Sequence, residues 1–130
     1  MAHPIRFDDD DPLLRRLRGL ALAFPEAQEK VAHGRPTFFT NKVFAYYGGS
    51  VKGDHGSPLL AHALLFLPDA DERAALLDDD RVHVPAYLGP SGWLALDLAG
   101  AEPDWDEVRE LLDASYRRTA PRTLVARLDA

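Results

Sequence analysis

Two aromatic and β-branched runs, residues 36–39 and 43–47, flank Thr40-Asn41-Lys42 and constrain the fold of this chain most. Asn tolerates a positive φ and Lys keeps a turn in water, so the arrangement predicts a tight β-hairpin. Pro36 has no N–H to donate and pushes the preceding residue towards extended geometry. We therefore expect Gly34-Arg35-Pro36 to form a kinked start to the first arm of this hairpin.

The second arm of the hairpin is apolar on both of its faces. Side chains alternate along a strand, so Phe44 and Tyr46 are expected on one face and Val43, Ala45 and Tyr47 on the other. A strand that is apolar on both sides belongs inside a sheet, so we expect this one to be central.

The rest of the sequence alternates short helical and extended patterns. Asp11 and Pro12 are suited to begin the first helix, and Asp69 and Asp104 each stand three residues before a Glu, as in a helix capping pattern. The pattern predicts helices over 11–24, 69–77, 104–118 and 121–128, and strands over 27–32, 59–67, 82–88 and 93–98, with a turn at 89–92 between the last two. Short connections favour an antiparallel sheet with helices packed on one face, a two-layer α+β domain.

The composition is that of one globular domain. We expect a flexible acidic segment over residues 1–10 and a single domain over 11–130. The chain has no cysteine, which excludes a disulfide, a thiol nucleophile and an iron–sulfur cluster, and no apolar run approaches the ~20 residues that span a bilayer. A cytoplasmic protein is the simplest expectation.

No motif for catalysis or cofactor binding stands out. The glycine-rich stretch 48–58 lacks the Lys-Ser or Lys-Thr of a phosphate-binding P-loop, and Gly89-Pro90-Ser91-Gly92 does not fit the G-x-S-x-G nucleophile elbow. The histidines lack metal-ligand spacing, and Asp78-Asp79-Asp80 is typical of a solvated turn. We therefore expect a non-enzymatic protein without a cofactor or a bound metal.

Charge is distributed unevenly along the chain. The net charge is −6, which by itself disfavours nucleic acid, yet residues 30–68 and 114–130 each carry +3 while residues 69–113 carry −10. The turns at 40–42 and 89–92 have basic or aromatic residues near them. If both turns project from one edge of the sheet, they form two wings whose cations contact phosphates.

Four stretches together resemble successive signatures of the MmcQ/YjbR-like family. They are His33-Gly34-Arg35-Pro36-Thr37-Phe38, Lys42-Val43-Phe44-Ala45, Pro85-Ala86-Tyr87 with Gly92-Trp93-Leu94-Ala95-Leu96, and Leu111-Leu112-Asp113-Ala114-Ser115-Tyr116. The resemblance covers about residues 12–128 and implies a two-layer fold like that of the frataxin homologue CyaY, with DNA binding through a double wing. The chain departs from the family in a longer loop over 48–58 and in Arg122 and Arg127, where lysines are common.

The leading hypothesis is a DNA-binding domain whose basic residues contact phosphates. The residues predicted for this role are Lys30, Arg35, Lys42, Lys52 and Arg81. Five such contacts predict a log–log salt slope of roughly −4 to −5 on duplex DNA.

Two other classes of function are open at this point. A protein that binds or sequesters a small aromatic ligand, such as a drug or metabolite, would use an aromatic cleft drawn from His33, Phe38, Tyr46, Tyr87 and Trp93. A protein-interaction adaptor would show an exposed apolar patch or a sizeable dimer interface.

Overall fold

A single six-stranded antiparallel sheet organises the structure, a computed structural model that describes residues 4–130. The strands are β1 (Gln28–Ala32), β2 (Arg35–Phe39), β3 (Val43–Tyr47), β4 (Ala63–Phe66), β5 (Val82–His83) and β6 (Leu94–Asp97). They lie in the order β1-β2-β3-β4-β6-β5, so β3 has a neighbour on each side, as its apolar faces predict.

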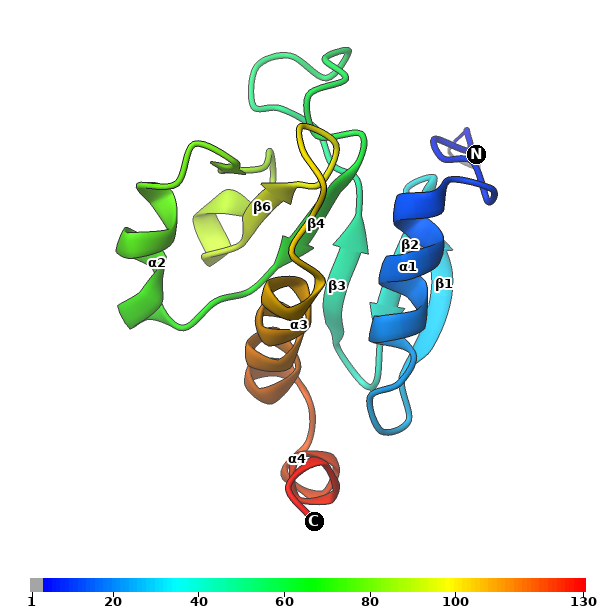
Figure 1. The fold of residues 1–130 in the computed structure, drawn as a ribbon, viewed down its shortest axis with the longest axis vertical. Helices are drawn as coiled ribbons and strands as arrows, with labels where there is room; N and C mark the ends of the chain where they lie inside the picture. Colours follow the sequence, from blue (N-terminus) through cyan, green and yellow to red (C-terminus); the bar gives the residue numbers. More distant parts are fainter. Residues whose placement is uncertain (1–3) are drawn as a thin grey trace.

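The helices form the second layer. They are α1 (Pro12–Ala21), α2 (Ala70–Leu77), α3 (Trp105–Thr119) and α4 (Arg122–Leu128), with a short 3-10 turn, η1, at Gly89–Ser91. Helices α1 and α3 lie side by side on one face of the sheet, and α2 lies beside β5 (Figure 1). The predicted two-layer α+β fold is confirmed. No helix of the described chain is long and apolar enough to cross a membrane.

Two of the three predicted helix caps are made by side chains. The Asp11 carboxylate accepts the Leu13 N–H at 2.9 Å, and the Asp104 carboxylate accepts N–H groups at the start of α3 at 3.1 and 3.2 Å. Asp69 stands at the N-cap of α2, but its side chain makes no capping hydrogen bond, so that part of the prediction is wrong.

The start of β2 is a hairpin turn rather than a kink. His33 and Gly34 both have positive φ, 53° and 80°, which matches the two-residue turns that join twisted antiparallel strands. Pro36 lies opposite Val31 of β1, and the pairing of β2 with β3 begins one residue later, at Thr37, so Pro36 has no register partner in β3. The expectation of a kinked start over 34–36 is therefore wrong, since the turn itself reverses the chain.

A β-bulge changes which side chains of β3 face the helices. The pairing with β2 moves from Val43 opposite Phe39 to Ala45 opposite Phe38, which leaves Phe44 as an extra residue. Phe44, Ala45 and Tyr47 consequently belong to the core under the helices, while Val43 and Tyr46 pack on the opposite face. The predicted alternation is wrong for this strand because strict period two does not pass through a bulge.

The second predicted hairpin is only partly present. Strand β5 is two residues long, and ten residues that include η1 connect it to β6, in place of the predicted turn at 89–92 between long strands. This connection, loop 84–93, folds back over the sheet. Its Ala86 N–H donates to the Ser50 carbonyl at 2.9 Å, and Pro85 bridges to Val51. The second turn therefore packs against the chain instead of projecting as a wing.

Loop 84–93 and the long loop 48–62 cover the face of β4 and β6 that points away from the helices. Leu60 and Trp93 from these loops are buried against Leu65 and Ala95 of the sheet. The predicted strand over 59–67 shortens to β4 because residues 58–62 turn into this cover. In Figure 1, loop 48–62 extends beyond the top of the sheet.

The predicted acidic N-terminal segment falls partly outside the described residues, at positions 1–3. In residues 4–10, the Arg6 N–H donates to the Gly34 carbonyl at 2.8 Å. Asp9 and Asp10 lie 2.9 and 3.0 Å from Arg18 and Arg15 of α1. These contacts place Arg6 beside the β1–β2 turn.

Candidate functional site

A cleft of about 540 Å³ opens on the side of the sheet away from α1 and α3. Its walls come from the N-terminal segment, the β1–β2 turn, the strands next to it, and loops 48–62 and 84–93. The polar and aromatic side chains that line it are Arg6, His33, Arg35, Tyr46, Ser50, His55 and Tyr87. A volume of this size is typical of small-molecule sites. None of the described lining residues is Asp or Glu, in a protein with 21 acidic residues.

Two rings from different loops stand at the opening of the cleft, and we call them the mouth pair. His55 and Tyr87 stack with centroids 5.3 Å apart and planes inclined by 28°. The Tyr87 hydroxyl lies 3.2 Å from His55 Nε2. Tyr87 is 79% exposed and has a φ of +65°, a backbone conformation that costs energy for a bulky residue. Burial does not explain this tyrosine, because most of its ring is in solvent.

The inner wall of the cleft is formed by side chains of the sheet that are packed from behind. Tyr46 packs edge-on against the buried Trp93, with ring centroids 5.3 Å apart, and burial raises the pKa of the Tyr46 hydroxyl. Leu65 supplies an apolar floor beside Gly49, where a Cβ atom would approach the leucine methyls to 2.9 Å. Tyr46 and Leu65 therefore add apolar surface to the cleft that the mouth pair also lines.

Arg35 is the only half-buried cation in this cleft among the residues that the structure describes. It has no carboxylate partner within residues 4–130, and burial, followed by the nearby charge of Arg6, lowers the pKa of its guanidinium. Gly48 makes room for it, because a Cβ at that position would collide with Arg35 Nη1. The guanidinium thus lies against bare backbone at the end of β3.

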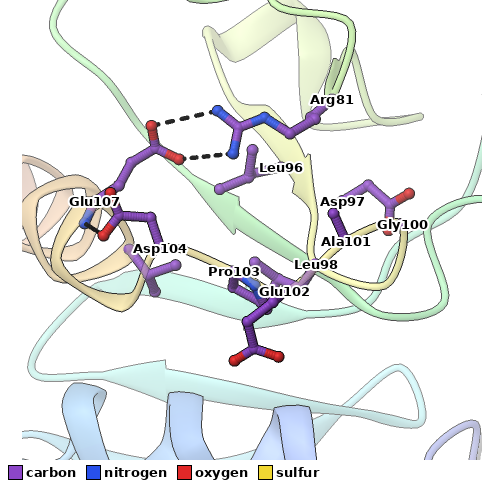
Figure 2. Close-up of a pocket in the computed structure, with 11 residues that line it drawn as sticks. Arg81, Leu96, Asp97, Leu98, Gly100, Ala101, Glu102, Pro103, Asp104 and Glu107 are labelled. Carbon is purple, nitrogen blue, oxygen red and sulfur yellow. Dashed lines mark hydrogen bonds and ion pairs between the residues drawn. The ribbon is translucent and has the colours of Figure 1, made fainter.

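A second, smaller hollow of about 240 Å³ lies between β6 and the start of α3 and contains Arg81. Figure 2 shows the Arg81 guanidinium directed at both oxygens of Glu107, and the ion pair measures 3.0 Å. Asp79 lies 2.6 Å from the same guanidinium. Two carboxylates already neutralise Arg81, and it lines a different hollow from Arg35.

The remaining predicted cations are separated. The Lys30 ammonium lies 4.7 Å from the centroid of the Phe39 ring, on the same face of the sheet as Arg35. Lys42 is exposed at the turn at the far end of β2, and Lys52 is exposed on loop 48–62. The basic C-terminal region is largely paired, since Arg117 contacts Asp113 and Asp129 at 2.6 and 2.7 Å.

Three of the five predicted cleft residues, His33, Tyr46 and Tyr87, do line the cleft. The structure places Phe38 in the core under the helices and Trp93 behind Tyr46, so neither reaches the cleft. Sequence reasoning missed Arg6 and His55, which reach the cleft from segments distant in the chain and without a motif of their own. Within residues 4–130, no group of three or more His, Asp or Glu side chains is arranged to hold a metal ion.

The fold and this cleft define a two-layer α+β domain with a lined hollow on the face that the helices leave free. The sequence profile of the YjbR family matches residues 22–118, most of the chain, and the protein belongs to this family. A search among curated proteins finds no match.

Proposed function

We propose that this protein is a non-enzymatic binding protein for a small molecule with a planar ring, held in the cleft between Tyr46 and the mouth pair. The observation that carries the proposal is the mouth pair itself. Tyr87 and His55 come from two loops that are joined by backbone hydrogen bonding, and their rings are stacked although most of Tyr87 is exposed. Exposed aromatic surface next to an apolar hollow is the usual construction of a ring-binding site.

The strained backbone of Tyr87 supports the same function. A tyrosine at positive φ costs on the order of 1 kcal/mol relative to glycine, and such residues concentrate at ligand sites. The stack with His55 is of similar size, because aromatic pairs contribute about 0.5–1.5 kcal/mol, so the ring adds little net stability to the fold. A role in binding accounts for a ring that folding alone does not require.

DNA binding is the second proposal, and one observation favours it. Lys30 and Arg35 share the face of β1 and β2 that the helices leave free. It ranks lower because Arg81 is already paired, the second turn packs back onto the sheet, and the net charge is −6. An adaptor role stays a prediction, and the large apolar side chains that are exposed come from separate segments of the chain.

The ring-binding proposal is tested by titrating the isotope-labelled protein with 2-naphthamide, a neutral planar probe, and following backbone amide shifts. We expect saturable shifts at Gly48, Gly49 and residues 86–88. Tyr87→Ala should weaken binding several-fold, because the ring loses its stacking partner. Leu59→Ala, which removes an exposed apolar side chain from loop 48–62 outside the cleft, should not. Shifts scattered over the surface, or none at millimolar probe, would overturn the proposal.

A parallel titration of a labelled short duplex, followed by fluorescence anisotropy at low and moderate salt, tests the DNA proposal. Binding at micromolar protein with a steep salt slope supports it, and no binding in low salt contradicts it.

A further inference from the structure

Arg35 differs from the arginines that form ion pairs in this protein. Five arginines have a carboxylate oxygen within 3.0 Å, namely Arg15, Arg18, Arg81, Arg117 and Arg127. Arg35 is more buried than most of them, yet it has no carboxylate partner in residues 4–130. A half-buried cation without a counter-charge is unfavourable, so the fold maintains it at a cost.

The surroundings of Arg35 increase that cost. The guanidinium cannot lose its proton near neutral pH, because arginine stays charged in proteins. Burial and the neighbouring Arg6 both act against its charge, and the cleft offers it no acidic side chain among the described lining residues. Two neighbouring like charges in a hollow that the mouth pair also lines are an arrangement that an anion would relieve.

The shape of the site points to a planar anion. Gly48 leaves space for the guanidinium against the backbone, Arg35 lines the cleft, and the guanidinium fork matches the two oxygens of a carboxylate. The ring surfaces of Tyr46 and Tyr87 line the same cleft. The guanidinium suits the charged end of a ligand, and the two tyrosine rings suit its aromatic end.

We infer that the ligand of the cleft is an aromatic carboxylate, whose ring lies against Tyr46 and the mouth pair and whose carboxylate pairs with Arg35 and Arg6. This inference rests on the ring-binding function proposed above and adds the charge of the ligand to it. Arg35 acts as the anchor because it is the more buried of the two arginines, and Arg6 adds charge from the rim.

A matched pair of probes tests the inference. 2-Naphthoate and 2-naphthamide share the ring and differ in the charge of one planar group, so calorimetric titration of both isolates the contribution of charge. We expect the wild-type protein to bind naphthoate at least roughly tenfold more tightly, the usual effect of one charge-assisted hydrogen-bonded pair. Arg35→Met should remove most of this preference while it leaves the affinity for naphthamide nearly unchanged.

Two further variants keep the test decisive. Lys30→Met removes a cation from the same face of the sheet but outside the cleft, and it should keep the full preference for naphthoate. Arg6→Gln, at an exposed position, should reduce the preference without endangering the fold if Arg35→Met proves unstable.

The outcomes separate the two proposals. Equal affinity of the wild-type protein for the two probes would overturn the carboxylate inference and leave ring binding in place. Failure of both probes to bind at millimolar concentration would overturn ring binding and the carboxylate inference together. A preference for naphthoate that survives both Arg35→Met and Arg6→Gln would show that the anion lies elsewhere, and would overturn the inference as well.

Discussion

The Tyr47 hydroxyl donates a hydrogen bond of 2.5 Å to the Asp11 carboxylate, and this bond ties β3 to the N-cap residue of α1. His62 Nδ1 lies 2.8 Å from the same carboxylate oxygen and 2.9 Å from the Tyr47 hydroxyl. Asp11 therefore caps its helix and anchors it to the sheet. Burial acts to raise the pKa of Asp11, but the hydrogen bonds from Tyr47, His62 and the Leu13 N–H together lower it below its ordinary value of 3.8.

The Asp11 anchor makes stability depend on pH in acid. A carboxyl group whose pKa is lower in the folded state contributes stability above about pH 3.8 and loses it as the pH falls through the folded pKa. We expect Asp11→Asn to cost about 1–2 kcal/mol of unfolding free energy at pH 7 and progressively less below pH 3.8. Urea titrations at several pH values measure this. Asp10→Asn, at an exposed position, should change little throughout, and a cost for Asp11→Asn that is independent of pH would contradict the assignment.

Ser115 of α3 is predicted to be essential for the contact between helix and sheet. Its buried hydroxyl donates to the Phe44 carbonyl at the bulge, at 2.5 Å, and accepts the Leu67 N–H at 2.9 Å. Ser115→Ala leaves two buried backbone groups unsatisfied, so we expect a loss of about 2–3 kcal/mol in denaturant unfolding. Thr119→Ala is the control, because its hydroxyl bonds only to carbonyls of its own helix and should cost less than about 1 kcal/mol.

Two glycine substitutions should have opposite effects. Gly48 has a φ of +87° and an added Cβ would displace the Arg35 guanidinium, so Gly48→Ala should destabilise the protein by at least about 1 kcal/mol and weaken naphthoate binding. Gly19 lies in α1 with no neighbouring atom within 4 Å of an added Cβ, so Gly19→Ala should stabilise by about 0.5–1 kcal/mol. Thermal unfolding of both variants tests the pair, and a neutral Gly48→Ala would refute the close approach of Arg35.

Tyr87→Gly should bind less well without a large change in stability. Glycine adopts the φ of +65° without strain but loses the stack with His55, and these two effects are of similar size, so we expect the unfolding free energy to change by less than about 1 kcal/mol, together with a several-fold loss of affinity for 2-naphthamide. Tyr87→Phe keeps the ring and the strain and removes only the exposed hydroxyl that lies 3.2 Å from His55 Nε2, so it should stay close to the wild type in both measurements. A loss of more than about 2 kcal/mol in Tyr87→Gly would mean that the ring serves the fold rather than a ligand.

Arg81→Met should leave duplex DNA binding unchanged, if any binding is observed. The guanidinium is shared by Asp79 and Glu107 at a partly exposed position, so its removal should change the unfolding free energy by less than about 1 kcal/mol. An Arg81 that contacted a phosphate would instead reduce the salt slope by about 0.9 when replaced. Anisotropy titrations of the wild type and the variant over a series of salt concentrations distinguish these results.

The sequence predicted those elements of the fold that are specified by residues close together in the chain. The caps at Asp11 and Asp104, the helix over 105–119 and the turn at 40–42 follow from residues close together in sequence. The bulge at Phe44 escaped prediction because it depends on how β2 and β3 register against each other. The length of β5 escaped prediction for a similar reason, since loop 84–93 bonds to Ser50 instead of continuing a strand.

The residues of the candidate site were likewise only partly predictable from the sequence. His33, Tyr46 and Tyr87 were predictable as aromatic or imidazole groups near the hairpins, but no spacing in the sequence places Arg6 and His55 beside them. Equally, the sequence marks Arg35 and Arg81 alike as basic residues, and only their surroundings in the structure distinguish them.

The sequence alone determined that this chain forms a two-layer α+β domain, because periodicity, caps and turn residues act over a few neighbouring positions, and the match to the family profile places it in the YjbR family. The tertiary structure decided which arginine side chains are paired with carboxylates and which are not. Arg81 meets two carboxylates, while folding buries Arg35 in a cleft with no described acidic side chain. Electrostatic pairing acts through space over a few ångströms, so it depends on contacts between distant segments that local sequence patterns do not specify.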